Sequence, residues 1–201
     1  MHSEFLPTRR ALLTGAAAAA LTAATPLRAL TTPQAQALVQ ALVDEINAVI
    51  ASGRSREAMY REFERIFVRY ADVPTIARTT LGPDARALSP AQMRDFTAAF
   101  QGYIARKYGS RFREWVGGRI EVQGARKVKS FYEVRSVAVL RGRSPFDLTF
   151  LVSDRSGQDR FFDMLIQGVS LLKSERAEIG AMFDRRRGDI AALTADLRRA
   201  G

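Results

Sequence analysis

The sequence contains no cysteine and only one histidine, His2, among its 201 residues. The absence of cysteine excludes disulfide bonds, thiolate metal sites and cysteine nucleophiles. His2 lies in an N-terminal segment that we expect to be cleaved, so the processed chain would also lack imidazole. Ser-His-Asp, Cys-His and His-based zinc sites would then be excluded. Catalysis by a pair of carboxylates stays open, although no spacing in the sequence nominates a pair.

Residues 1–29 have the features of a signal peptide. Arg9 and Arg10 precede an apolar stretch from about Leu12 to Ala24, and Ala29 offers a small residue for cleavage. The stretch is shorter than the roughly 20 apolar residues that span a membrane. The adjacent arginines favour twin-arginine export. An ordinary secretory signal and cleavage after Ala24 are the alternatives. Both signal types predict a protein outside the cytoplasm.

Positive charge is in excess, with 31 Lys and Arg against 21 Asp and Glu and a net charge of +10. Taken alone, this charge is typical of nucleic-acid binding. Export argues against nucleic acid and favours peripheral contact with anionic lipid head groups, or mutual repulsion that maintains solubility. Basic clusters lie at 126–129, 141–143 and 185–187, where turns or helix ends are expected. This placement favours a local structural role over docking to an acidic partner or membrane.

Hydrophobic spacing predicts an α+β fold in a single domain over residues 30–201. Helical periodicity covers about 32–51, 56–70 and 72–81, with Thr32 as the expected first cap and Ser89 opening a long further helix. After Gly117 and Gly118 the pattern alternates, which predicts about four strands in an antiparallel meander. Helical periodicity then returns over about 170–183 and again after residue 189. The order is therefore N-terminal helices, sheet, C-terminal helices.

No motif indicates a cofactor or a metal. The sequence has neither a G-x-G-x-x-G loop nor a phosphate-binding G-x-x-x-x-G-K. The oxygen-rich segment 154–159 lacks the alternating acids and the final Glu of a calcium loop, so a plain turn is favoured. An aromatic stripe over Phe96, Phe100 and Tyr103 is expected to oppose a sheet face bearing Phe150 and Met164. Periodicity alone favours a packed core there over a cavity.

Three ordered stretches carry a resemblance to a known family. The first is Leu81-Gly82 followed by Leu88-Ser89-Pro90-Ala91-Gln92 and Phe96. The second is Tyr103 with Tyr108-Gly109. The third and most specific runs Phe162-Asp163-Met164-Leu165-Ile166-Gln167-Gly168-Val169-Ser170-Leu171. With these motifs the chain resembles the MlaC family of periplasmic phospholipid-binding proteins, also described as toluene-tolerance proteins.

The resemblance implies a helix-backed, curved sheet enclosing an apolar cavity for acyl chains, with the head group at its mouth. It implies a periplasmic carrier, not an enzyme, that shuttles phospholipid between an outer-membrane lipoprotein complex and an inner-membrane ABC transporter complex. We expect a monomer without cofactor. An apolar small-molecule-binding protein or enzyme on a related fold, or an interaction module without cargo, are the alternatives. The residues expected to face the lipid are Phe96, Phe100, Ile104, Val139, Phe150, Val152, Met164 and Ile166.

Overall fold

The structure is a computed structural model that describes residues 29–200, so the expected signal peptide lies outside the described residues except for Ala29. The described residues form six α-helices and a five-stranded antiparallel sheet, which is the expected α+β class. The helices are α1 (Thr32–Ala51), α2 (Arg56–Tyr70), α3 (Val73–Leu81), α4 (Pro90–Gly109), α5 (Leu171–Arg185) and α6 (Ile190–Arg199), with 3-10 turns η1 (Gly82–Arg86) and η2 (Ser110–Trp115). The strands are β1 (Arg119–Val128), β2 (Phe131–Val139), β3 (Phe146–Ser153), β4 (Arg160–Ile166) and β5 (Val169–Ser170).

Polar side chains begin the helices largely where the sequence predicts. Ser89 Oγ accepts from Gln92 N at 3.2 Å while Gln92 Oε1 accepts from Ser89 N at 2.9 Å, so the expected reciprocal cap of α4 is confirmed. Ser170 caps α5 through a single bond, in which its Oγ accepts from Lys173 N at 3.1 Å. The expected cap of α1 at Thr32 is wrong by one residue. Gln34 reaches back three positions to the backbone N–H of Thr31, and Thr31 is therefore the cap.

The five strands follow one another in chain order, β1 to β5, as an antiparallel meander. Four strands were expected, and the fifth is a two-residue strand that pairs with the end of β4. The tight β4–β5 turn consists of Gln167 (φ 49°) and Gly168 (φ 81°). Two successive positive φ angles are the geometry that joins neighbouring antiparallel strands with the correct twist. The expected turn at Gly168 is thus confirmed.

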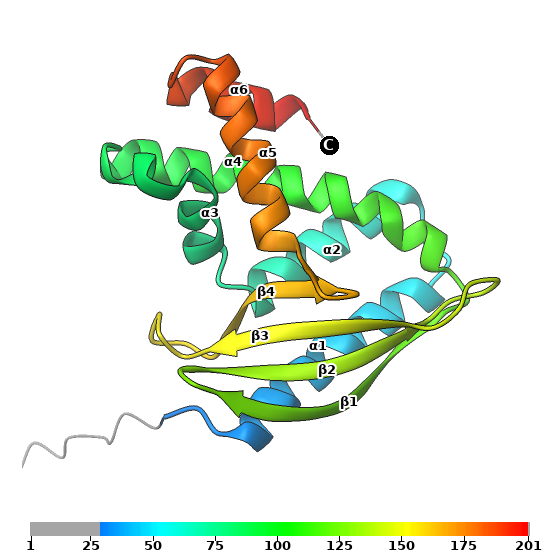
Figure 1. Ribbon diagram of the computed structural model, residues 1–201. Coiled ribbons are helices and arrows are strands. Elements are labelled where there is room, and N and C mark those ends of the chain that lie inside the picture. Colours follow the sequence, from blue (N-terminus) through cyan, green and yellow to red (C-terminus); the bar gives the residue numbers. More distant parts are fainter. Residues whose placement is uncertain (1–28, 201) are drawn as a thin grey trace, which may run out of the picture.

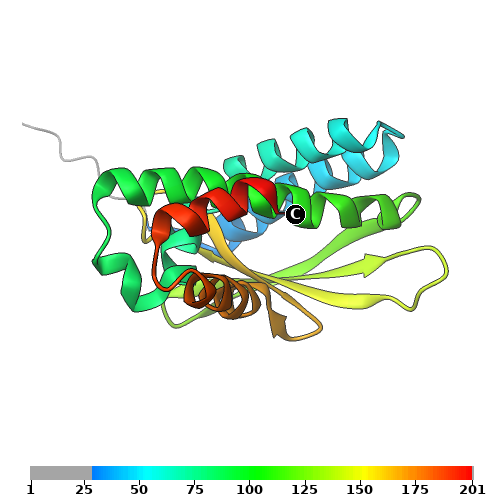
Figure 2. The ribbon, with the colours of Figure 1, turned by 90° about the horizontal axis from the view of Figure 1, so that it is seen from above.

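The helices form two groups around this sheet. Figure 1 shows α1 lying across one face of the curved strands, while α4, α5 and α6 lie beyond the β4 edge. Seen from above in Figure 2, α4 runs alongside α6. Buried residues accordingly gather in two hydrophobic clusters, one between α1 and the sheet and one among α3, α4, α5 and α6.

One side chain fixes α1 to the edge of the sheet. Asn47 Nδ2 donates to the carbonyl of Ile120 and Asn47 Oδ1 accepts from the N–H of the same residue, each at 2.9 Å. This pair of bonds satisfies backbone groups at the start of β1 that no neighbouring strand pairs on that side. The helix is thereby held at a defined distance from the inner face of the sheet.

Candidate functional site

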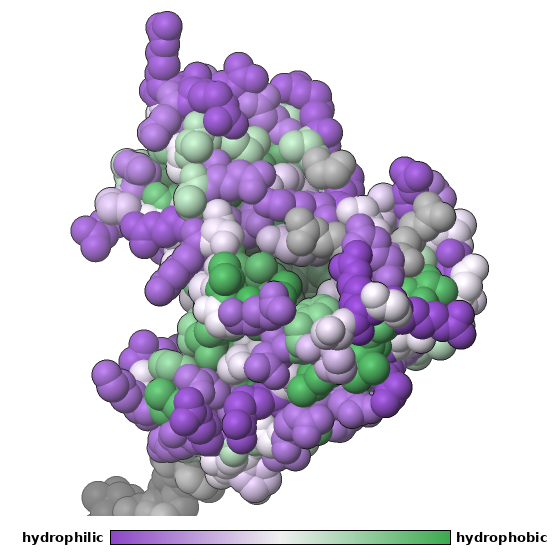
Figure 3. Space-filling view, turned by 45° about the vertical axis from the view of Figure 1, so that its right-hand side comes forward, coloured by the Kyte–Doolittle hydropathy of each residue, from purple (hydrophilic) through white to green (hydrophobic). Residues whose placement is uncertain are grey.

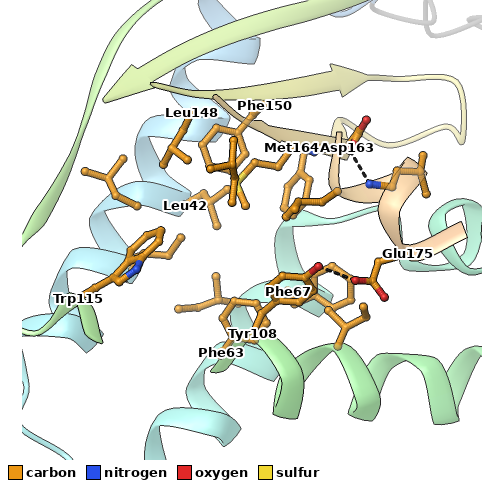
Figure 4. Close-up of a pocket in the computed structure, with 18 of the residues that line it drawn as sticks. Leu42, Phe63, Phe67, Tyr108, Trp115, Leu148, Phe150, Asp163, Met164 and Glu175 are labelled. Carbon is orange, nitrogen blue, oxygen red and sulfur yellow. Dashed lines mark hydrogen bonds between the residues drawn. The ribbon is translucent and has the colours of Figure 1, made fainter. Parts of the chain in front are cut away.

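A pocket of about 450 Å³ lies between the inner face of the sheet and helices α1, α2 and α4. Its volume falls within the range of roughly 300–1,000 Å³ that is typical of small-molecule sites. Figure 3 shows a hollow on this face of the molecule with hydrophobic residues along its rim. Figure 4 shows side chains from the strands above and from the helices below converging on the space between them.

The upper wall is the inner face of β3 and β4. Leu148 pairs with Ile166 and Phe150 pairs with Met164 across the two strands. Directly paired residues of antiparallel strands point to the same face of the sheet, so these four apolar side chains form one continuous surface. All four line the pocket.

The lower wall comes from one side of α4 and one side of α2. Phe100, Ile104 and Tyr108 are four residues apart along α4 and therefore lie on one helical face. Phe63 and Phe67 repeat the same spacing on α2, and their rings are stacked with centroids 6.2 Å apart. Aromatic side chains thus supply much of the surface opposite the sheet.

Five of the eight residues expected to face a lipid line this pocket: Phe100, Ile104, Phe150, Met164 and Ile166. The other three do not. Phe96 is fully buried in the helical cluster, one turn before Phe100 on α4. Val152 lies on the inner sheet face but is buried against the α1 side.

Val139 is placed on the outer face of the sheet, contrary to the expected inward orientation. Ala138 is fully buried, and the alternation of a strand then turns Val139 the other way. The inner face of β2 includes Ser136 and Ala138, whereas the larger Val137 and Val139 are outside. An assignment that places the larger side chains inside is therefore wrong by one residue on this strand, and this is why Val139 was expected to face inward.

Several pocket residues were not foreseen from the sequence. Trp115 closes one side, where its ring meets Phe146 edge-to-face with centroids 6.0 Å apart. Phe67 and Leu42 come from helices whose apolar stripes gave no sign of facing a cavity. An apolar stripe on a helix looks the same whether it meets packed side chains or an open space, so only the assembled fold distinguishes them.

Asp163 is a buried carboxylate at the pocket wall. Its Oδ1 accepts from the backbone N–H groups of Met164 and Leu172 at 2.8 and 3.0 Å, and its Oδ2 accepts from Ser170 Oγ at 2.6 Å. These bonds join β4, β5 and the first turn of α5. Both carboxylate oxygens are engaged within the protein, which makes Asp163 an organiser of the wall.

Glu175 is the second buried carboxylate, and it belongs to a polar cluster that joins α4 to α5. Its Oε1 accepts from Lys107 Nζ at 2.7 Å and from Tyr108 Oη at 2.5 Å, the latter contact being visible in Figure 4. Lys107 also contacts Glu178 Oε2 at 2.5 Å, and Tyr103 donates to Glu178 Oε1. The lysine charge is thus shared between two carboxylates.

The environment of this cluster shifts the pKa values of its members. Burial raises the pKa of Tyr103, and its hydrogen bond to Glu178 raises it further. Burial works against the charged form of Lys107, but hydrogen bonds to Glu175 and Glu178 outweigh burial and raise its pKa. For Glu178 burial is likewise outweighed, by the contacts with Lys107 and Tyr103, and its pKa is lowered. At neutral pH Lys107 and Glu178 are therefore charged, and Tyr103 keeps its proton.

A different kind of ion pair lies at the pocket mouth. Arg143 Nη2 contacts Glu114 Oε2 at 3.3 Å, and the two side chains are 59% and 57% exposed. Arg143 lies in the segment between β2 and β3, and Glu114 lies in η2. Both line the pocket together with Ser144 and Gln167. The pocket therefore combines an apolar interior with a charged, accessible entrance.

This arrangement can enclose an apolar molecule and leave its polar end at the surface. Within residues 29–200 no group of three or more His, Cys, Asp or Glu side chains is placed to hold a metal ion. Asp154, in the oxygen-rich turn, instead accepts from the N–H of Leu30 at 2.9 Å. No helix in the described part of the chain is long and apolar enough to cross a bilayer.

Comparison with known proteins agrees with this geometry. Residues 36–199 match the family described as MlaC protein. The chain belongs to the MlaC family. A solved structure, a phospholipid-binding protein from Ralstonia solanacearum in complex with a phospholipid, superposes on this MlaC-family chain with a TM-score of 0.70. The two sequences are 20% identical, and the match covers 82% of this chain and 95% of the other. At this identity the superposition establishes the shared fold.

Proposed function

We propose that this MlaC-family protein is a periplasmic phospholipid carrier that encloses acyl chains in the pocket between β3, β4, α2 and α4. The observation that carries the proposal is the pocket itself, about 450 Å³ and lined mainly by apolar and aromatic side chains. The Ralstonia protein that shares the fold was solved with a phospholipid bound, which supports the same ligand class here. Phe100, Ile104, Phe150, Met164 and Ile166 are the expected residues that contact the chains.

The physical need for such a pocket follows from the cost of moving lipid through water. Each methylene transferred from an apolar phase to water costs about 0.8 kcal/mol, so a diacyl lipid leaves a membrane very slowly by itself. A carrier must replace most of those apolar contacts. Its affinity must also be comparable with that of the donor and the acceptor, since a ligand held far more tightly would not be released.

The remaining parts of the proposal concern the route. Residues 1–29 serve as an export signal of the twin-arginine type, and residues 30–201 form the lipid-binding domain. The carrier receives and delivers lipid at an outer-membrane lipoprotein complex and an inner-membrane ABC transporter complex, as the family resemblance implies. It acts as a monomer that performs no catalysis.

The test is native mass spectrometry of the exported protein, purified from cells without detergent. We expect a population whose added mass equals one or more phospholipids, identified by extraction and fragmentation. Refilling should follow when the emptied protein is mixed with phospholipid vesicles. Protein that carries no lipid from cells and takes none from vesicles would refute the proposal.

A second candidate function is binding of a smaller apolar molecule, with or without chemistry upon it. The observations that favour it are the volume, which suits a small ligand, and the two buried carboxylates of Asp163 and Glu175 at the wall. The same measurement separates the candidates, because a small apolar ligand adds a much lower mass than a phospholipid.

A further inference from the structure

The charged side chains that line the pocket divide into two pairs. Among the described residues they are Asp163, Glu175, Glu114 and Arg143. Asp163 and Glu175 are 8% and 3% exposed and are engaged with Ser170, Lys107 and backbone groups of the protein. An incoming polar group at Asp163 or at Glu175 Oε1 would have to displace bonds that hold α5 in place, and Glu175 Oε2, which has no hydrogen-bond partner in the described part of the chain, is buried away from solvent. These two carboxylates are therefore poor sites for the polar end of a ligand.

Glu114 and Arg143, by contrast, are accessible to the polar end of a ligand. Each side chain is more than half exposed, and one contact of 3.3 Å joins them. Water competes strongly for such an exposed pair, so a ligand can separate the two groups at low cost. Figure 4 places Trp115, the neighbour of Glu114, on the opposite side of the pocket from Glu175. The accessible charges thus lie at one end of the apolar space.

We infer that Arg143 and Glu114 together recognise a zwitterionic phospholipid head group, with Arg143 binding the phosphate and Glu114 binding a primary ammonium. This inference rests on the proposed function and names the class of phospholipid. A guanidinium offers several N–H donors that match phosphate oxygens, and a carboxylate accepts N–H bonds from an ammonium. Ser144 and Gln167 at the same entrance add neutral hydrogen-bonding groups for the ester region.

The net positive charge of the protein and the Glu114–Arg143 pair favour different phospholipids, so an experiment can separate the two effects. The full sequence has a net charge of +10, and loss of residues 1–29, with three arginines and one glutamate, leaves +8, so the exported protein attracts anionic lipids such as phosphatidylglycerol through its general field. Phosphatidylglycerol presents a phosphate to Arg143 but has no ammonium for Glu114. A preference for phosphatidylethanolamine would therefore oppose the overall charge and would have to come from a local acidic group.

The experiment is uptake from vesicles that contain equal amounts of phosphatidylethanolamine and phosphatidylglycerol, both with the same isotopically labelled acyl chains. The label separates newly acquired lipid from lipid carried through purification, and native mass spectrometry counts each species. Salt at about 0.15 M limits the general field to about 8 Å. We expect labelled phosphatidylethanolamine to exceed phosphatidylglycerol by about fivefold, as one added charge-assisted hydrogen bond would give.

Two substitutions test the two halves of the site. Glu114→Gln should bring the ratio of the two lipids to about one, because the ammonium loses its charged acceptor, while Glu114→Asp should retain the preference. Arg143→Gln should lower uptake of both lipids by about fivefold, because both contain the phosphate. Both positions are exposed, so the melting temperature of each variant should match that of the unaltered protein.

The chain offers a matched control pair. Arg119 and Glu121 form another exposed ion pair, at 2.5 Å, on β1 outside the pocket lining. Arg119→Gln and Glu121→Gln change the net charge by the same amounts and should leave both the ratio and the uptake unchanged. If the control variants matched the mouth variants, overall charge would be the cause and the inference would be overturned.

Other outcomes separate the inference from the proposed function. Uptake of both lipids in equal amounts, or a preference that Glu114→Gln leaves intact, would overturn the head-group assignment while the carrier function stood. An excess of phosphatidylglycerol in the unaltered protein would do the same. Uptake of neither lipid would overturn both proposals.

Discussion

Two hydrophobic regions of this molecule differ in how completely their side chains are covered. In the helical cluster Phe96, Leu193 and Leu197 have exposed fractions of 0% and pack against one another from α4 and α6. At the pocket wall Leu148 and Phe100 are also 0% exposed, whereas Met164 and Ile166 on the same wall are only partly buried. The partly buried side chains are therefore the ones that border the open space.

The difference has an energetic meaning. Side chains that face an empty space lose the dispersion contacts that close packing would supply on that side. A folded chain that keeps such a space must be stabilised elsewhere, and the cluster among α3, α4, α5 and α6 provides that stabilisation. Bound acyl chains would restore the missing contacts at the wall. The two regions should accordingly respond in opposite ways to changes in side-chain volume.

The largest expected effect comes from filling the pocket. Met164→Trp places a large ring in the space beside Phe150, so lipid uptake should fall below detection in native mass spectrometry. Stability should change little, because the ring enters open volume. Val152→Trp is the matched variant on the neighbouring strand. There the same ring has no space, and overpacking should cost about 1–3 kcal/mol of unfolding free energy. Equal behaviour of the two variants would remove the distinction between wall and core.

Truncation of one side chain in each region compares the two directly. Leu193→Ala in the helical cluster should lower the free energy of unfolding by about 4 kcal/mol, because a packed site loses both transfer energy and contacts. Ile166→Ala at the wall should cost about 2 kcal/mol, since this side chain is only partly buried. Denaturant titrations of lipid-free protein check both values. The comparison would fail if Ile166→Ala cost as much as Leu193→Ala.

The polar cluster between α4 and α5 lies at the boundary of the two regions. Lys107→Met leaves Glu175 as a buried charge without its cation, which should lower the free energy of unfolding by about 2 kcal/mol. The loss is smaller than for a fully buried pair because Lys107 is partly exposed. Arg198→Met, which removes an exposed partner of Asp95, is the control and should have an effect near zero. Denaturant titration of both variants provides the measurement, and similar losses would contradict a special role for the cluster.

The smallest effect is expected from acid. Burial works to raise the pKa of Glu45, but hydrogen bonds from Tyr70 and Arg65 outweigh burial and lower the pKa below its ordinary value of 4.5. The pKa of Glu178 is lowered as well. Carboxylates with a lowered folded pKa add stability above their ordinary pKa, and that stability is lost as the pH falls through the folded value. The melting temperature should therefore decrease below about pH 4.5. Glu45→Gln should show a smaller decrease, and an equal one would exclude Glu45 as a source.

Much of the fold was accessible from the sequence because its signals are local. The reciprocal cap of Ser89 and Gln92, the change to alternation after Gly118 and the turn at Gly168 each depend on a few neighbouring residues. The sequence did not reveal which way Val139 points. Its larger side chain favoured an inward position, but pairing with β3 places Ala138 inside. The sequence also gave no means of distinguishing Phe96 from Phe100. They share one stripe of α4, and only the position of α6 determines that Phe96 is covered by side chains.

The sequence by itself determined the order of helices and strands, the resemblance to the MlaC family and the lack of thiol and imidazole chemistry in the expected processed chain. Tertiary structure alone decided which apolar residues border an open space, that Asp163 and Glu175 are engaged within the protein, and that Glu114 meets Arg143 at the entrance. Hydrophobic patterning records which face of an element avoids water. Whether that face meets another side chain or a cavity depends on distances between elements far apart in the chain.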